Sequence, residues 1–355
     1  NGTIYTLDES FSTVAAMAVK DGRILAAGTT EDILQRYSAE QSIDLEGKFV
    51  YPGLIDAHCH FLGYGQSLLH ADLAGTSSFE EIIGILRDRQ KKYPSEWILG
   101  RGWDQNDWEV KEFPHRDQLD KAFPDNPVLL RRIDGHAAIA NTEAFKRATV
   151  NESTFVEGGS LIKKNGKLTG VLVDNAIGLV EKMVPEPDEQ EVVNALLRGE
   201  ANCFAVGLTS VHDAGLDYKT IDLVDSLQKS GKLKMRIYAM LSPGKKNYEH
   251  YLDKGIYKTG RLTVRAIKLY TDGALGSWGA LLLEPYADDP DNAGLAVSSE
   301  EFLREQCRLA FKNGYQVNTH CIGDSANRLM LDIYADLLKG KNDLRWRIEH
   351  SQIIH

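Results

Sequence analysis

The chain lacks several features, and each absence excludes a class of protein. It has no run of eighteen apolar residues, so we expect no transmembrane helix. Its net charge is −10 and it has no basic cluster, which argues against a nucleic-acid partner. Its 4 cysteines are widely spaced and form no Cys-x-x-Cys pair. They therefore indicate reduced thiols and not a disulfide framework.

Internal repeats, low-complexity segments and a recognisable signal peptide are also absent. The chain opens at Asn1 and not at a methionine, so its first residues indicate no cellular compartment. Its 43% hydrophobic and 26% charged residues are typical of a globular protein. At 355 residues it exceeds the usual size of a single core, which favours one large α/β barrel plus a smaller domain.

The sequence predicts a small β-sandwich domain, represented by residues 1–52. The turn Asp21-Gly22 is typical of a tight hairpin. Short strands are expected at residues 3–7, 14–19, 23–27, 42–45 and 49–51. The last of these strands leads directly into Pro52-Gly53.

Residues 53–355 are predicted to form a parallel α/β barrel, because strand patterns there alternate with helix patterns. Ser298 and Glu301 are expected to form a capping box for a helix that ends at Gly314. The expected strands are 54–58, 208–212, 235–240, 264–270, 315–320 and 346–350. These are two strands short of a closed (β/α)8 TIM barrel.

Residues 64 to about 187 do not follow this alternation, and we interpret them as a long insertion after the first barrel strand. Insertions at that end of a barrel usually shape the active site.

The most informative stretch is GLIDAHCH at 53–60. Residues i and i+2 of a strand point to the same face, so His58 and His60 can direct two imidazoles at one metal ion. For an isolated His-x-His pair, ordinary hydrogen bonding at a strand end is an equally good explanation. Further nitrogen side chains at other strand ends favour the metal.

Those further side chains are Lys268, His320 and His350. A lysine within an apolar strand costs desolvation energy unless it is neutralised, paired or modified, although an edge-strand lysine can also extend to water. A lone strand histidine is more often structural than a ligand. Four histidines and a lysine at the ends of four strands instead indicate nitrogen ligands of the kind zinc prefers.

Four stretches resemble the metal-dependent amidohydrolase superfamily, and in particular its N-substituted formamide deformylase-like branch. They are GLIDAHCH at 53–60, IKLYTDGALGSWGA at 267–280, NTHCIGD at 318–324 and RIEHSQ at 347–352. Three more resemble segments of that branch: RGWDQNDW at 101–108, RIDGHAAIAN at 132–141 and GLTSVHDAG at 207–215. The resemblance extends over essentially the whole chain.

The resemblance implies a role for each ligand. His58 and His60 would bind the more buried ion, Lys268 carboxylated by carbon dioxide would bridge two ions, and His320 and His350 would hold the second. Carboxylation would convert a buried ammonium into an anionic oxygen ligand. A metal-bound hydroxide would then attack the substrate carbonyl.

The resemblance also implies a proton-shuttling aspartate at the end of the eighth barrel strand. Neither Asp272 nor Asp324 occupies the matching place, so we expect the catalytic aspartate and the last two strands to lie beyond His355.

Weaker hypotheses concern the insertion and the second strand. Candidate substrate-binding residues are Trp103, Asp104, Trp108, His136 and Asn141. His212 and Asp213 are candidates for orienting the metal ligands by hydrogen bonds without binding the metal themselves. For all of these residues, ordinary packing and loop hydrogen bonds are the competing explanation.

The sequence thus predicts a zinc-type hydrolase, with one or two divalent ions, that cleaves a non-peptide carbon–nitrogen bond of a small amide such as an N-acyl or N-formyl amine. A single-metal hydrolase of another amide or ester, with Lys268 unmodified, is one alternative. A non-catalytic metal-bound binding protein is another. A homo-oligomer remains compatible with the sequence.

Overall fold

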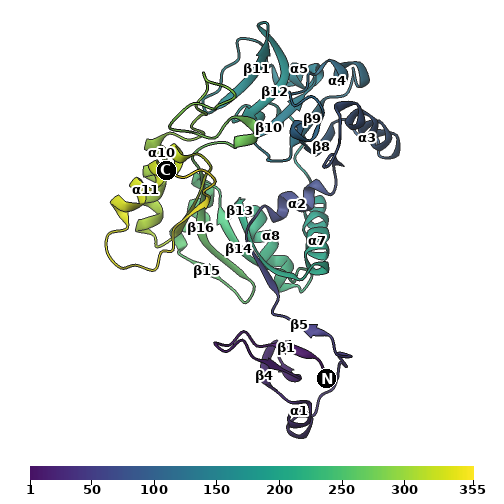
Figure 1. Ribbon diagram of the computed structural model, residues 1–355, viewed down its shortest axis with the longest axis vertical. Helices are drawn as coiled ribbons and strands as arrows, with labels where there is room; N and C mark the ends of the chain where they lie inside the picture. The colour runs from purple at the N-terminus through teal and green to yellow at the C-terminus, as the bar shows by residue number, and fades with distance from the viewer. The chain divides into compact units, whose positions relative to one another are not determined.

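The computed structural model describes residues 1–355. The chain divides into two compact units, each described here by itself. The smaller unit contains Asn1–Ile55 and Gly207–Thr209, and the larger contains Asp56–Val206 and Ser210–His355. Figure 1 labels the helices and strands along the chain. No helix is both long enough and apolar enough to cross a membrane.

The smaller unit is built from short strands and one helix. Its three-stranded sheet has the order β2-β1-β5, and β3 and β4 form a separate hairpin. The hairpin turn uses positive φ at Asp21 (51°) and Gly22 (72°), as the sequence predicted for a tight turn. The elements are β1 (Thr3–Tyr5), β2 (Thr13–Val14), β3 (Ala16–Lys20), β4 (Arg23–Gly28), α1 (Thr30–Arg36) and β5 (Phe49–Val50).

Two expectations for this unit need correction. Residues 42–45 form no strand, because Asp44 instead accepts hydrogen bonds from the Asn1 side chain (2.5 Å) and the Glu46 amide (2.8 Å). Helix α1 was not expected. Its sequence signal is Thr29, whose hydroxyl accepts a hydrogen bond from the Asp32 amide at 3.2 Å. A helix of only about two turns gives little periodicity to detect.

The larger unit is built around a parallel sheet with the order β18-β17-β16-β14-β13-β6. All six expected barrel strands are present. Strand β15 (Tyr257–Lys258) was not expected and adds antiparallel to β16. The six strands are β6 (Leu54–Cys59), β13 (Leu208–Leu216), β14 (Arg236–Leu241), β16 (Leu262–Tyr270), β17 (Gln316–Cys321) and β18 (Arg347–His350).

The sheet curls until its two outer strands touch. The Arg347 guanidinium of β18 donates to the carbonyl of Ala57 in β6 at 3.2 Å. His58 Nδ1 of β6 lies 3.0 Å from Glu349 Oε2 of β18. The larger unit is therefore an α/β fold with a nearly closed barrel of six parallel strands.

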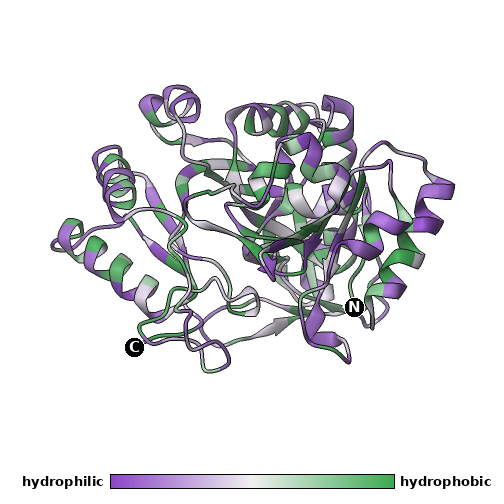
Figure 2. Cartoon of the chain, turned by 90° about the horizontal axis from the view of Figure 1, so that it is seen from above, coloured by the Kyte–Doolittle hydropathy of each residue, from purple (hydrophilic) through white to green (hydrophobic).

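Amphipathic helices cover the outside of this sheet. In Figure 2 the helices carry hydrophobic residues on one side and hydrophilic residues on the other. Their apolar sides and the strands form one continuous core that includes Leu196, Val224 and Leu303. The helices are α2 (Phe61–Ser67), α7 (Glu189–Ala205), α8 (Tyr218–Lys229), α9 (Lys245–His250), α10 (Glu300–Lys312) and α11 (Asp324–Leu337), with short turns η2 (Leu252–Lys254) and η3 (Leu275–Ser277).

The cap of α10 differs from the expected one by a residue. Ser299, and not Ser298, caps the helix, accepting a hydrogen bond from the Phe302 amide at 3.3 Å. Glu301 therefore does not occupy the third helical position that a capping box requires. This start places Leu303 and Cys307, both fully buried, against the sheet, so core packing decides the register.

The residues predicted to form an insertion carry a second, six-stranded sheet with the order β11-β12-β10-β9-β8-β7. It has its own apolar cores on its two faces. Its strands are β7 (Ala71–Asp72), β8 (Ile98–Trp103), β9 (Val128–Arg132), β10 (Ala137–Ala140), β11 (Gly159–Lys164) and β12 (Lys167–Asp174). Its helices are α3 (Phe79–Lys92), η1 (Gln105–Asp107), α4 (Asp117–Ala122), α5 (Thr142–Ala148) and α6 (Ile177–Glu181).

Candidate metal centre

The four candidate histidines lie at the carboxyl ends of barrel strands, where barrel enzymes place their chemistry. His58 is on β6, His60 directly follows it, His320 is on β17 and His350 ends β18. Their rings lie side by side. The ring-centroid distances are 5.8 Å for His58–His60, 4.6 Å for His58–His350 and 4.7 Å for His320–His350.

Lys268 lies on β16 within the same barrel and is completely buried. Its ammonium has no hydrogen-bond partner and sits 4.4 Å from the centre of the Tyr270 ring. Both ring nitrogens of His58 also lack a hydrogen-bond partner. The Glu349 carboxylate lies 3.0 Å from His58 Nδ1, but its orientation does not allow a hydrogen bond. Such orphaned polar atoms cost about 1–3 kcal/mol each unless something binds them.

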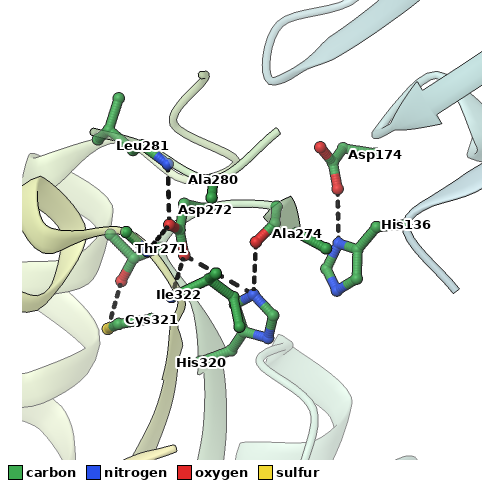
Figure 3. Close-up of polar contacts among 12 residues, drawn as sticks. His136, Asp174, Thr271, Asp272, Ala274, Ala280, Leu281, His320, Cys321 and Ile322 are labelled. Carbon is green, nitrogen blue, oxygen red and sulfur yellow. Dashed lines mark hydrogen bonds and ion pairs between the residues drawn. The ribbon is translucent and has the colours of Figure 1, made fainter. Parts of the chain in front are cut away.

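The histidines that do have partners keep one nitrogen free. His60 Nδ1 lies 2.9 Å from the carbonyl of Ala214, and His320 Nε2 lies 3.0 Å from the carbonyl of Gly273. Figure 3 shows His320 with its neighbours. A ring nitrogen that donates to a carbonyl leaves the other nitrogen as an acceptor, which is the usual state of a metal-binding histidine.

Burial keeps His60, His320 and His350 neutral. Desolvation lowers the pKa of His60 to about 4, that of His350 to about 4 and that of His320 to about 2, with smaller contributions from neighbouring cations. Desolvation also lowers the pKa of Lys268 to about 8, against the opposing attraction of Glu349. Neutral imidazoles and an amine that deprotonates easily are the forms that bind a metal or react with carbon dioxide.

The structure does not close these side chains around one centre. No group of three or more His, Cys, Asp or Glu side chains is arranged to hold a metal ion. The histidines are neighbours in a row, His60, His58, His350 and His320, rather than a shell. The donor set nevertheless fits a divalent ion, because its members are nitrogen side chains, and both ring nitrogens of His58 and the Lys268 ammonium have no hydrogen-bond partner.

Asp272 has a structural environment that sequence reasoning did not anticipate. Its buried carboxylate accepts backbone hydrogen bonds from Leu281 (2.9 Å), Ile322 (3.0 Å) and Gly323 (2.8 Å), and it lies 3.7 Å from His320 Nε2. Burial raises the pKa of Asp272 to about 6, although the backbone hydrogen bonds oppose the rise. As Figure 3 shows, Asp272 joins the loop after β16 to the end of β17 and so fixes His320.

Asp213 and His212, predicted to support the ligands, have different surroundings. Asp213 is buried and accepts hydrogen bonds from the amides of Phe61 (2.9 Å) and Leu62 (3.1 Å), directly after His60. His212 stacks on Tyr238 at 4.7 Å, and its Nδ1 has no partner. Asp213 therefore positions His60 through the backbone, while His212 contacts none of the candidate ligands by hydrogen bond.

A cavity of about 760 Å³ lies between the barrel end and the second sheet. This volume suits a small organic substrate. The side chains that line it include two from the barrel end, His60 and Tyr270, and several from the second sheet and nearby helices: Tyr64, His70, Leu99, Arg101, Leu129, Arg131, Asp134, His136, Glu181 and Val184.

Of the five candidate substrate-binding residues, only His136 lines this cavity. Trp103 and Trp108 are buried in the core of the second sheet, where their indole N–H groups donate to the carbonyls of Leu130 (2.8 Å) and Thr76 (3.0 Å). These two side chains therefore serve packing in this structure.

The polar candidates Asn141 and Asp104 also make structural contacts. Asn141 is fully buried, caps α5 and holds four backbone groups through its amide. Asp104 pairs with Arg132. Asn141 and Asp104 thus make the structural hydrogen bonds that were the alternative to a substrate-binding role.

His136 is the exception, and it has a partner that the sequence did not reveal. Its Nδ1 lies 2.6 Å from Asp174 Oδ1, and its ring centre lies 4.7 Å from that of His320. Burial raises the pKa of Asp174, while the hydrogen bond to His136 opposes this. In Figure 3 His136 and Asp174 reach from the second sheet toward His320.

The loop after β16 packs tightly against the second sheet. A Cβ atom added at Gly273 or Gly279 would overlap the Asp174 carboxylate, and one added at Gly276 would lie 2.8 Å from the Arg132 guanidinium. Gly273 and Gly276 are therefore needed for close approach between the loop that follows Lys268 and the residues that hold His136.

Comparison with known proteins agrees with this geometry. A model of the amidohydrolase family matches residues 41–355. The putative amidohydrolase YtcJ of Bacillus subtilis is 33% identical over 365 residues, covering 99% of this chain and 68% of YtcJ. The N-substituted formamide deformylase of Arthrobacter pascens is 24% identical over 380 residues, covering 99% of this chain and 68% of the enzyme.

A solved structure is also similar over the whole length of this chain. The crystal structure of an uncharacterized metal-dependent hydrolase from Pyrococcus furiosus superposes with a TM-score of 0.72 and 30% sequence identity, covering 100% of this chain and 72% of that one. The chain spans about two thirds of the length of its curated relatives. The family match over most of the chain, together with the barrel and its histidines, shows that this chain belongs to the amidohydrolase family.

Proposed function

We propose that the protein hydrolyses a non-peptide carbon–nitrogen bond of a small amide, such as an N-acyl or N-formyl amine, using one or two divalent ions, with zinc the expected metal. The observation that carries this proposal is Lys268, which is buried without a hydrogen-bond partner in a barrel whose strand ends carry four neighbouring histidines.

The residues that would hold the metal are His58, His60, Lys268, His320 and His350. When bound, the metal would polarise the scissile carbonyl and lower the pKa of a coordinated water. Carboxylation of Lys268 fits its surroundings, because the neutral amine adds carbon dioxide and releases one proton, giving a carbamate anion in place of an unpaired ammonium. The pKa of Lys268, lowered to about 8 by burial, favours the reactive neutral amine.

Other residues of the chain would act on the substrate directly. Burial raises the pKa of Tyr270 to about 12, so its phenol stays protonated and can donate a hydrogen bond within the cavity. His136, held by Asp174 through Nδ1, keeps Nε2 free to bind a polar group of the substrate.

The proposal also covers the wider architecture. Residues 1–52 would belong to a small β-sandwich domain, and residues 53–355 would belong to a (β/α)8 barrel with residues 64 to about 187 inserted. The division of the chain after Ile55 and the separate sheet formed by β7 to β12 support this arrangement.

One observation favours a second candidate, a single-metal hydrolase with unmodified Lys268. The Lys268 ammonium lies 4.4 Å from the Tyr270 ring centre, an arrangement that stabilises a cation. A carbamate would not benefit from this contact.

Metal analysis combined with a substrate screen tests the proposal. The full-length protein would be purified with added zinc and bicarbonate, assayed for metal by mass spectrometry and screened against N-formyl and N-acetyl amines. The variants His58→Asn, His320→Asn and Lys268→Met should each lose metal and hydrolysis, whereas Arg87→Gln, an exposed change on α3, should keep both. Stoichiometric metal without hydrolysis of any amide would contradict the enzymatic proposal and favour a binding protein.

A further inference from the structure

Arg101 and Arg131 are the two arginines that line the cavity, and Arg101 is the one that forms no ion pair. It lines the same cavity as His60 and Tyr270 and is only partly exposed. Its single hydrogen bond is a long one, 3.4 Å from Nη2 to the carbonyl of Ile133. No carboxylate lies within ion-pair distance of it, although every other charged side chain in the cavity is paired.

The remaining charges show this contrast. Arg131 forms an ion pair with Glu181, and both side chains line the cavity. Asp134 forms an ion pair with Arg132 at 2.5 Å, and Arg132 also pairs with Asp104. Of the two arginines that line the cavity, Arg101 is therefore the one without an ion-pair contact.

The backbone makes room for this guanidinium. A Cβ atom added at Gly135 would lie 3.3 Å from Arg101 Nη2, and Gly135 has a φ of +78°, which favours glycine. Burial lowers the pKa of Arg101, with the positive charge of Arg131 adding to the effect and the negative charge of Asp134 opposing it. An anion in direct contact with the guanidinium would offset the cost of its burial. A planar guanidinium binds a carboxylate through two parallel hydrogen bonds.

The rest of the cavity wall is apolar on one side. Leu99, Leu129 and Val184 line it together with Arg101. A ligand that reaches His60 from this cavity would thus meet both a cation and aliphatic side chains.

From this arrangement we propose that Arg101 binds a carboxylate group of the substrate, so that the protein acts on N-acylated amino acids with an apolar side chain. Hydrolysis of such a substrate rests on the proposed function, whereas binding of its carboxylate by Arg101 does not. The carboxylate would pair with Arg101, the side chain would contact Leu99, Leu129 and Val184, and the acyl carbonyl would face the strand-end histidines.

Calorimetry on metal-free, full-length protein tests the binding step. The probes are N-acetyl-L-leucine, N-acetyl-D-leucine and the decarboxylated analogue N-(3-methylbutyl)acetamide. At least one N-acetyl-leucine should bind at least about tenfold more tightly than the neutral amide, as expected for a charge-assisted pair. Equal affinity for all three probes would overturn the inference.

Matched variants assign the effect to Arg101. Arg101→Gln should weaken N-acetyl-leucine binding at least about tenfold, and Arg101→Lys should weaken it less, because lysine keeps the charge but loses the paired hydrogen bonds. Arg87→Gln should change nothing. Unchanged binding in a folded Arg101→Gln or, if that variant does not fold, in Arg101→Lys would overturn the inference.

Hydrolysis by the zinc-loaded protein separates the two proposals. A preference for N-acetyl-leucine in kcat/KM that falls in Arg101→Gln mainly through KM supports both. Arg101-dependent binding without hydrolysis of any amide would overturn the proposed function and leave the anion site in place. Hydrolysis with equal kcat/KM for acid and neutral amide would overturn the anion site and leave the proposed function in place.

Discussion

Asp213 holds the backbone of Phe61, the residue that follows His60: its carboxylate lies 2.9 Å from the Phe61 amide and also accepts from Leu62. Two otherwise free N–H groups at the start of α2 are thereby bound by a buried carboxylate on a neighbouring strand. The direction of the chain at the first metal-ligand motif is thus set from β13.

Replacing this carboxylate should therefore disturb both stability and the metal site. Asp213→Asn leaves one amide without its acceptor, so we expect a loss of about 1–3 kcal/mol in unfolding free energy. Zinc affinity should fall about 10–100-fold, as is typical when a group that orients a ligand is removed. Urea unfolding and competitive zinc titration measure the two effects. Unchanged zinc affinity in a destabilised variant would show that Asp213 serves the fold alone.

Lys268 should oppose folding in the metal-free protein, because it is a buried amine without a partner. Lys268→Met fills the same space without a polar group, and we expect it to raise the unfolding free energy of the metal-free protein by about 1–3 kcal/mol. The same variant should bind less than half the zinc of the parent. A lower melting temperature in the absence of metal would contradict this account of Lys268.

His320 should make the metal-free protein more stable as the pH rises. Burial lowers its pKa to about 2, below the ordinary value of 6.5, so the unfolded chain binds a proton between these values and the folded chain does not. Stability from this group is lost as the pH falls below about 6.5, with a slope of at most about 1.4 kcal/mol per pH unit.

His320→Asn removes this contribution while keeping a polar side chain. Urea unfolding of the metal-free protein between pH 4.5 and 6.5 should give a shallower rise for the variant, in a range set by the value of 6.5 for an unperturbed imidazole. Identical slopes for the two proteins would mean that His320 is not the titrating group.

Trp103 should matter for folding and not for substrate choice. It is fully buried and its indole N–H donates to Leu130, so Trp103→Ala should cost about 3–5 kcal/mol. Trp103→Phe keeps most of the volume and should cost less. Substrate preference of the folded Trp103→Phe protein should equal that of the parent, and a changed preference would place this ring in the substrate site.

The sequence predicted the barrel strands well because most are apolar runs, and His58, His320 and His350 lie at the ends of three of them. It did not reveal the roles of Trp103 and Asn141, because an aromatic or amide side chain in a loop-rich segment reads the same whether it packs inward or lines a cavity. Long-range partners such as Asp174 for His136 and Glu349 for His58 leave no local pattern at all.

Arg101 illustrates the same limit in another way. Its segment was part of the family resemblance, but a charge becomes informative only when the charges around it are known to be paired. Which charges are paired is known only from the three-dimensional structure and not from the spacing of residues in the sequence.

The close fit of Gly273 against Asp174 has a mechanical consequence. The strand that carries Lys268 continues into a loop in which Gly273 lies directly against the Asp174 carboxylate. That carboxylate binds His136, and no side chain separates it from the loop backbone. Because Gly273 and Asp174 are in close contact, the carboxylate cannot move toward the loop unless the loop also moves. A ligand that moved His136 and Asp174 would therefore also press on the loop that follows the lysine strand.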